Sequence, residues 1–435
     1  MEEYMKYSKT LGSVVLSTLL LLGTTGCDSS DDPVADATEV AEEIITPYTR
    51  VAILADSGST DADIQAVADK IAHYVTLTDE TADDGHDFDF GWVIGGANKG
   101  AGGETYTTKD LLPIPSAGTD AGGKSRIVEF CNGGYATMAT NTGRFHGSAL
   151  PCEVSVHSDG TNIYIDMLNA HAIFSLFFTD IEDPDGALEA VANAVNTEIR
   201  ELVLAALNDT TVAAQSPLAG AVGITEDAAT ITTAIPYTES TLAMGPTFTQ
   251  TQIDNDVAFK SPYIIFEYRS PSNTFTTKVD DKALAQAIID TMGENGTDIY
   301  TNVPGVSDGS GWKSAREAPL AIPGVQVVEA CSGKYATLAT KLGNEYLTAL
   351  PCEITVLVDE NDPTKLTISF LSPNFMFGTM FQGAVEKAYA DGKITKDDVI
   401  MYSTLADVVF SDLRLIVDTA IQKYDPTLTL QTPAP

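Results

Sequence analysis

Four cysteines in two matched pairs are the residues of this 435-residue chain whose types and spacing point most clearly to chemistry. Cys131 and Cys152 are 21 residues apart, and Cys331 and Cys352 repeat that spacing. An even number of cysteines in an exported protein predicts disulfides. In each pair the first cysteine ends a predicted strand and the second begins the next, so antiparallel neighbours would bring their Cα atoms within reach of a bridge. We therefore expect one disulfide per pair, contributing about 3 kcal/mol through a closed loop of about 20 residues.

A redox or sulfur-handling dithiol is the second use of the same thiols. Glu129 and Glu329 each stand two residues before a cysteine, which places them on the same strand face as that cysteine. A carboxylate in that position raises a thiol pKa, and no Cys-x-x-Cys motif is present to lower it. The disulfide is therefore the preferred interpretation, and the redox dithiol and incidental reduced thiols remain alternatives.

A metal site is a third use, and the ligand count argues against it. Zinc takes about four protein ligands in structural sites. His146 and His157 lie near the first cysteine pair, but Tyr346 and Leu357 stand at the corresponding positions near the second. We accordingly predict no metal and no cofactor.

The cysteines belong to a repeated block. Residues 127–156 and 327–356 are identical at 16 of 30 positions without a gap. Agreement of this length does not arise by chance, and it indicates tandem copies of one structural unit. Further polar residues recur at the same offset and are candidate ligand-binding residues, with capping and sheet solvation as their alternative roles: Glu129, Tyr135, Glu153, Glu329, Tyr335 and Glu353.

Both copies predict the same order of elements around the block. An apolar strand and an amphipathic helix precede it, and a strand hairpin, an apolar helix and a long closing helix follow it. In the first copy these elements are expected near 50–55, from 61 onward, and at 153–167, 170–178 and 185–207. In the second copy they are expected near 263–268, from 280 onward, and at 353–371, 373–381 and 396–423. The predicted fold class is α+β, with two copies of a small domain in which helices cover an antiparallel sheet.

This succession of a strand, a short turn, an Ala-rich helix and a Leu-Pro step before a hairpin resembles the bacterial family called domain of unknown function 302. The matching stretches are 130–133 with 150–152, and 330–333 with 350–352. The resemblance implies a small α+β fold with an antiparallel sheet and no established activity. Many members are similar to Gly-Asn-Pro at the turn, whereas this chain has Cys131 and Gly133 in the outer positions, so no role of that turn carries over.

The N-terminus has the pattern of an export signal. Lys6 and Lys9 precede an apolar run over residues 11–22, which is shorter than the roughly 20 residues that a spanning helix needs and fits the core of a secretory signal. Cys27 follows shortly after, in a context that resembles the lipobox of bacterial lipoproteins, whose cysteine is lipidated. We expect an exported cell-envelope lipoprotein that faces the periplasm, at the inner or the outer membrane. An ordinary signal peptide with an incidental cysteine is the alternative.

Composition sets the remaining boundaries. Residues 78–124 are rich in Gly and Asp and predict a long loop, while residues 208–257 are rich in Thr and Ala and predict a linker. The predicted organisation is a signal peptide (1–26), a lipidated cysteine with a flexible tether (27–47), a first repeat (48–207), a linker (208–257), a second repeat (258–425) and a tail (426–435).

Charge and motifs narrow the function. The 24 Lys and Arg residues against 61 Asp and Glu residues give a formal net charge of -37, which repels phosphate backbones and excludes nucleic acid as a partner. Membrane contact is then expected through the lipid anchor. The sequence has no His-Glu-x-x-His motif, no Rossmann fingerprint and no histidine shared by both copies. We predict a non-enzymatic protein that binds a small molecule or an envelope protein, with a thiol-based redox or sulfur-handling protein as the alternative.

Overall fold

The computed structural model describes residues 43–55, 61–77, 91–94, 125–150, 152–183, 185–210, 234–260, 262–277, 279–295, 312–316, 324–349, 352–359 and 361–431. By its contacts the chain divides into the units Met1–Ala41 and Glu42–Pro435, and every described residue belongs to the second unit. The expected signal peptide and Cys27 lie outside the described residues. Among the helices that are described, none is long and apolar enough to cross a membrane.

Residues 48–207, here called the first half, form an antiparallel sheet that also takes in two short strands from the segment 238–244. The strand order in the described residues is β3-β4-β5-β6-β2-β7, and β8 pairs with β2 as well. The strands are β2 (Tyr48–Leu54), β3 (Trp92–Ile94), β4 (Ser125–Asn132), β5 (Cys152–Ser158), β6 (Ile163–Leu168), β7 (Thr238–Glu239) and β8 (Ala243–Met244).

Residues 258–425, the second half, form a sheet with the same succession of strands, to which the expected tail adds one short strand. Its described order is β11-β12-β13-β14-β10-β15, and all pairings are antiparallel. The strands are β10 (Tyr263–Arg269), β11 (Trp312–Arg316), β12 (Val325–Ser332), β13 (Cys352–Val358), β14 (Lys365–Leu371) and β15 (Thr429–Leu430). The α+β class with antiparallel sheets and covering helices, as predicted from the sequence, is confirmed.

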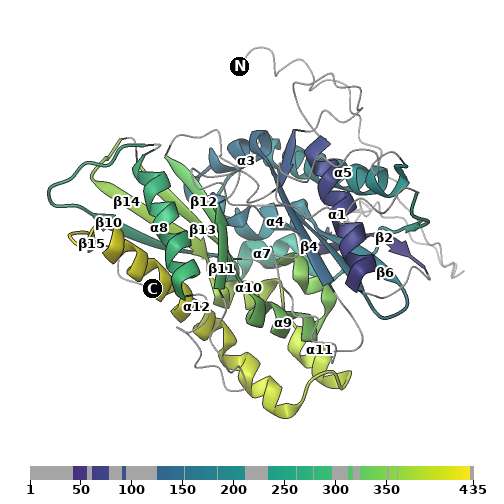
Figure 1. Ribbon diagram of the computed structural model, residues 1–435. Coiled ribbons are helices and arrows are strands. Elements are labelled where there is room, and N and C mark those ends of the chain that lie inside the picture. The colour runs from purple at the N-terminus through teal and green to yellow at the C-terminus, as the bar shows by residue number, and fades with distance from the viewer. Residues whose placement is uncertain are drawn as a thin grey trace, which may run out of the picture. The chain divides into compact units, whose positions relative to one another are not determined.

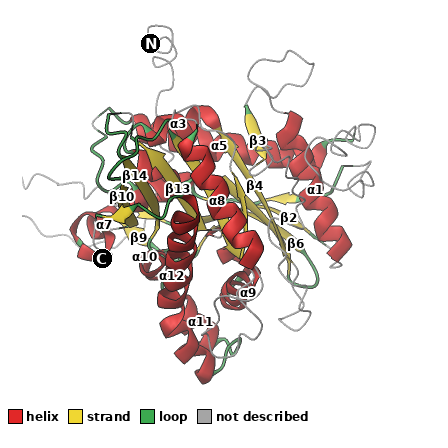
Figure 2. Ribbon diagram, turned by 60° about the vertical axis from the view of Figure 1, so that its left-hand side comes forward, coloured by secondary structure: helices red, strands yellow, loops and turns green. Residues whose placement is uncertain are grey.

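Two long helices cover one face of each sheet. In the first half α1 (Asp61–Leu77) packs on β3, β4 and β5 and lies against α5 (Ala187–Asn208) (Figure 1). In the second half α8 (Asp280–Asn295) packs on β11, β12 and β13 and lies against α12 (Lys396–Tyr424) (Figure 2). Each helix buries an apolar stripe at helical spacing, as the sequence pattern requires.

The repeated block folds into a helix whose start is fixed by a side-chain cap. Asn132 ends β4, and its Oδ1 accepts hydrogen bonds from the backbone N–H groups of Gly134 (2.9 Å) and Tyr135 (3.2 Å) at the start of α3 (Gly133–Thr140). Ser332 caps α9 (Gly333–Leu342) in the same way, accepting from the N–H of Tyr335 at 3.4 Å. Asn and Ser are preferred at this position because they satisfy N–H groups that the helix itself cannot.

After each capped helix comes a short 3-10 helix that lies on the sheet of the other half. The helix η2 (Arg144–Ala149) contacts β13 and β14, and η6 (Asn344–Ala349) contacts β5 and β6. Ser148 Oγ of η2 lies 2.8 Å from Thr355 Oγ1 and 3.1 Å from Ser369 Oγ in the second sheet. The packing of η6 on the first sheet explains why β5 is buried along nearly its whole length. Helices of the first half cover one face of β5, and η6 covers the other.

The segment expected to be a linker takes part in the fold where it is described. β7 and β8 pair with β2, and β9 (Phe248–Thr249) pairs with β1 (Ile44–Ile45). Phe248 and Ile253 are buried in a core shared by both halves. Residues 211–233 of the expected linker, and most of the expected 78–124 loop, lie outside the described residues.

Candidate functional site

A small, mainly apolar pocket lies in the first half where β4 and β5 meet α3, α4 (Ala170–Phe177) and α5. Its cavity volume is about 40 Å³, within about 530 Å³ of surrounding empty space that includes its opening to solvent. Residues of the repeated block form much of the wall, together with apolar residues of α4 and α5. The wall includes Trp92, Asn132, Tyr135, Leu150, Cys152 and Val195.

A carboxylate behind this wall holds two aromatic residues. Tyr135 donates its hydroxyl hydrogen to Glu198 Oε1, and Trp92 Nε1 donates to Glu198 Oε2 at 3.0 Å. The Trp92 and Tyr135 ring centroids are 6.1 Å apart, with the rings tilted by 51°. Glu198 on α5 therefore fixes the position of both rings, and their polar atoms are engaged by it.

The second half repeats the phenol–carboxylate contact in a more closed setting. Tyr335 donates to Asp412 Oδ2 at 2.5 Å, and both residues are buried, whereas Tyr135 is only partly buried. Trp312 faces Ser332 in the strand register as Trp92 faces Asn132, although the Trp312 side chain lies outside the described residues.

Sequence reasoning missed the tryptophans and the two carboxylates. The chain has only two tryptophans, and each follows a glycine, at Gly91-Trp92 and Gly311-Trp312. That repetition was a usable signal. The two tryptophans are not separated by the 200 residues that separate the two copies of the repeated block, and neither are Glu198 and Asp412. A comparison of the two copies without gaps therefore misses both pairs.

The expected disulfide between Cys131 and Cys152 is absent, and the strand register gives the reason. Phe130, not Cys131, faces Cys152 across β4 and β5. Residues directly opposite each other share a face, and successive residues alternate. The side chain of Cys131 therefore points toward the second half, where it packs near Val325 and Val327, while Cys152 packs with the core under the helices. This prediction was wrong.

The same register recurs in the second half. Ala330, not Cys331, faces Cys352. The side chains of Cys331 and Cys352 lie outside the described residues, so the predicted bridge between them stays a prediction.

The Cys152 thiol is poorly suited to nucleophilic chemistry. Burial first, and then the carboxylates of Glu153 and Glu198, raise its pKa to about 12. Because the thiolate is the reactive form, a thiol with this pKa is almost entirely protonated and inert at neutral pH.

The candidate glutamates separate into two groups. Glu153 and Glu353 are both buried and line a second cavity of about 30 Å³ between the two halves. Glu129 and Glu329 face them in the register, and their side chains lie outside the described residues. The second cavity shares part of its wall with the apolar pocket, namely Ala149, Leu150, Leu168 and Ile173.

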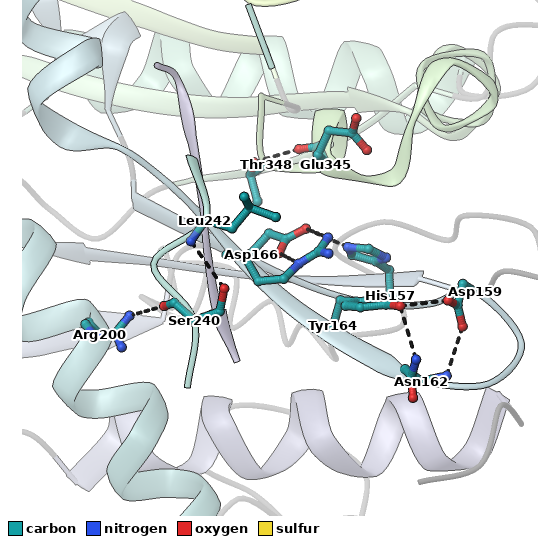
Figure 3. A network of polar contacts seen from close by, with 11 residues as sticks. His157, Asp159, Asn162, Tyr164, Asp166, Arg200, Ser240, Leu242, Glu345 and Thr348 are labelled. Atoms are coloured by element: carbon teal, nitrogen blue, oxygen red, sulfur yellow. Dashed lines mark hydrogen bonds and ion pairs between the residues drawn. The ribbon is translucent and has the colours of Figure 1, made fainter. Parts of the chain in front are cut away.

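The two histidines considered as metal ligands have other partners. His157 Nε2 lies 2.7 Å from Oδ2 of the fully buried Asp166 (Figure 3). Asp166 also forms a two-point contact with Arg50 at 2.8 and 3.0 Å. Burial raises the pKa of Asp166, but hydrogen bonds from His157 and Arg50 outweigh it and hold that pKa below its usual value. His146 Nε2 lies 3.0 Å from Asp180 Oδ1.

One phosphate-loop pattern also occurs, as Gly118 to Ser125, with the order Gly-x-x-x-x-Gly-Lys-Ser. Such a loop binds phosphate because it leads into the N-terminus of a helix. Here Ser125 begins the strand β4, so the required helix does not follow. Residues 118–124 lie outside the described residues.

Comparison with known proteins adds a family for part of the chain. The family described as "Domain of unknown function DUF302" matches residues 115–206. A solved structure, "Crystal structure of uncharacterized conserved protein DUF302 from Bacillus stearothermophilus", is 16% identical, covers 36% of this chain and 94% of its own, and has a TM-score of 0.24. No curated protein matches. The stretch that this family model matches contains Tyr135, Cys152 and Glu198, and the printed description of the family gives no activity.

Proposed function

We propose that this protein is an exported, lipid-anchored binding protein whose first half holds a compact ligand in the apolar pocket. The observation that carries the proposal is convergence. Asn132, Tyr135, Leu150 and Cys152, all from the repeated block, line one cavity together with Trp92. Pockets with apolar walls and a few fixed polar groups are the usual form of small-molecule sites.

The cavity size limits the ligand. A volume of about 40 Å³ is several times the roughly 10–15 Å³ that one water requires, and well below the roughly 150 Å³ of a cavity that takes benzene. The ligand therefore inserts a slender group such as a short alkyl chain. The remainder of a larger ligand would lie at the opening.

Binding is favoured over the thiol-based alternative by the same residues. A redox dithiol needs two sulfurs that can meet and one that ionises near neutral pH. Cys131 and Cys152 lie on opposite faces of the sheet, and burial with two carboxylates raises the pKa of Cys152 to about 12. Glu198 receives hydrogen bonds from two side chains, which suits a positioning role better than proton transfer.

In this proposal the second half is a duplicate of the first in which side chains occupy the position of the pocket. The repeated block and the matching strand orders support a tandem duplication. At positions that correspond through the phenol–carboxylate pairs, the larger Leu405 stands in place of Val191, Leu413 stands in place of Ile199 at equal size, and Tyr335 is buried. The larger Leu405 and the burial of Tyr335 support a filled site in the second half.

A pocket-filling variant tests the binding function. 1-Butanol is the neutral probe, and at about one hundred times its Kd we expect it to raise the Tm by about 3 °C. Val195→Phe should abolish that rise because the new ring occupies the cavity. Val409→Phe, at the corresponding position of α12, controls for overpacking a helix and should retain the rise. If Val195→Phe responds to butanol like the unmodified protein, the pocket is not the binding site.

The envelope address is tested separately. Cys27→Ser removes the only side chain that could carry the proposed lipid at the end of the signal, so we expect the protein to move from the membrane fraction to the soluble fraction of osmotically opened cells. Immunoblotting of both fractions measures this, and Cys131→Ser serves as the control cysteine. Retention of the Cys27→Ser variant in the membrane fraction would contradict the lipid anchor.

A further inference from the structure

Resting on the proposed function, we propose that the ligand of the apolar pocket is a cation, a short-chain alkylammonium whose nitrogen lies beside Trp92 and Tyr135 in the combined field of Glu198 and Glu153. The shape of the pocket limits the size of the ligand, and its surroundings favour one sign of ligand charge. Three observations indicate that this charge is positive.

The first observation is the aromatic pair. Trp92 and Tyr135 line the pocket with ring centroids 6.1 Å apart, and both donate their polar hydrogen to Glu198. Aromatic rings attract cations through their quadrupole, and a hydrogen bond from the ring to a carboxylate makes the ring more electron-rich. Tyr135 is partly exposed and Trp92 is buried, so a ligand that enters from solvent reaches the Tyr135 ring first and Trp92 deeper in the pocket.

The second observation is the raised pKa of Cys152, a residue of the pocket wall, because this pKa depends on the local electrostatic field. After burial, the charges of Glu153 and Glu198 are what raise the pKa of Cys152. Burial opposes a charge of either sign, whereas the part of the shift that comes from the two carboxylates opposes a ligand carboxylate and favours an ammonium. The wall thus discriminates against fatty acids of the same chain length.

The third observation is the absence of a competing positive charge in the walls. Among the described residues that line the apolar pocket or the adjoining cavity, none is Lys, Arg or His. Arg50, in the same sheet, is engaged by Asp166 at 2.8 Å. Glu353 joins Glu153 in the adjoining cavity, behind the shared wall that includes Leu150. The acidic side chains next to the pocket are therefore Glu198, which accepts hydrogen bonds from two residues of its wall, and Glu153, which lines the adjoining cavity.

Three probes of matched size separate shape from charge. n-Butylammonium, 1-butanol and butyrate are titrated by isothermal calorimetry at equal ionic strength, about 0.15 M, which screens distant surface charge. We expect butylammonium to bind about tenfold more tightly than butanol, and butyrate at least about tenfold more weakly than butanol. Equal binding of butanol and butylammonium, or tighter binding of butyrate, would overturn the charge assignment and leave the pocket in place. Failure of all three to bind would overturn the proposed function itself.

A charge-neutralising variant locates the effect. Glu198→Gln keeps an oxygen that can accept from Trp92 while removing the negative charge. We expect it to weaken butylammonium about tenfold and butanol less than about twofold. Glu386→Gln on α11 (Ala384–Ala390) removes an exposed carboxylate of the second half and should change neither. An equal loss in both variants would mean that the net charge of -37 attracts the cation non-specifically, which would refute the assignment. Tryptophan fluorescence and circular dichroism verify that each variant is folded.

Discussion

Replacing Asp166 with alanine should cost about 3–5 kcal/mol of unfolding free energy, because it leaves the positive charge of Arg50 buried without its carboxylate. Asp166 is fully buried, and the Arg50 side chain is only 14% exposed. His157 loses its 2.7 Å contact in the same variant. The cluster occurs on one sheet only, since the corresponding positions of the second sheet are Ile265 and Ser369.

Urea unfolding measures this effect, and Ser369→Ala is the matched control. Ser369 occupies the equivalent register position and makes hydroxyl hydrogen bonds to Ser148, so its loss should cost about 1 kcal/mol. The pH dependence gives a second readout. Because the pKa of folded Asp166 is depressed, its contribution is fully present above the unfolded pKa of about 3.9 and is lost as pH falls through the folded value. The variant should lack this acid-dependent component. A loss for Asp166→Ala no larger than that for Ser369→Ala would contradict the account.

Replacing Tyr335 with phenylalanine should destabilise the protein by about 2 kcal/mol, because Asp412 is 4% exposed and loses a 2.5 Å hydrogen bond. Tyr135→Phe removes the matching hydroxyl from the first half. Its cost should stay under about 1 kcal/mol, since Glu198 is partly exposed and keeps the hydrogen bond from Trp92.

The difference between these two variants is the quantity of interest, because both make the same chemical change at corresponding positions. Thermal and urea unfolding, carried out side by side, measure it. Similar losses in the two halves would show that the second site is as open to water as the first, contrary to the filled-in state proposed for it.

Much of the fold follows from short-range patterns in the sequence. The hairpins and the amphipathic helices each depend on a few neighbouring residues, and they lie close to where those residues predict them. β10 shows the alternation of buried and partly exposed residues that half-covered strands require. The class of the protein was predictable for this reason.

The absence of the cysteine bridge was not predictable, because it depends on a strand register that differs by one residue from the one the bridge needs. Placing two cysteines at adjacent strand ends is compatible with either Cys131 or Phe130 opposite Cys152, and only the first choice allows a bridge. No local pattern distinguishes them. Packing of the second half against Cys131 does, and that contact joins residues about 200 positions apart.

The candidate site was hidden for a similar reason. Trp92 lies on a strand of three residues within a stretch whose composition predicts a loop. Glu198 is one of several exposed-looking acids on α5, and only the folded arrangement brings it to both Trp92 and Tyr135. Two-residue strands such as β7 and β8 likewise carry no sequence pattern of their own.

Because η2 and η6 each lie on the sheet of the opposite half, neither half has a complete interior by itself. Separating the two halves would expose both sheets to solvent at once. The exposed area would include the contact of Gly147 with the second sheet, where a Cβ would lie only 3.0 Å from Thr355 Oγ1. The chain should therefore melt in a single cooperative event across both halves.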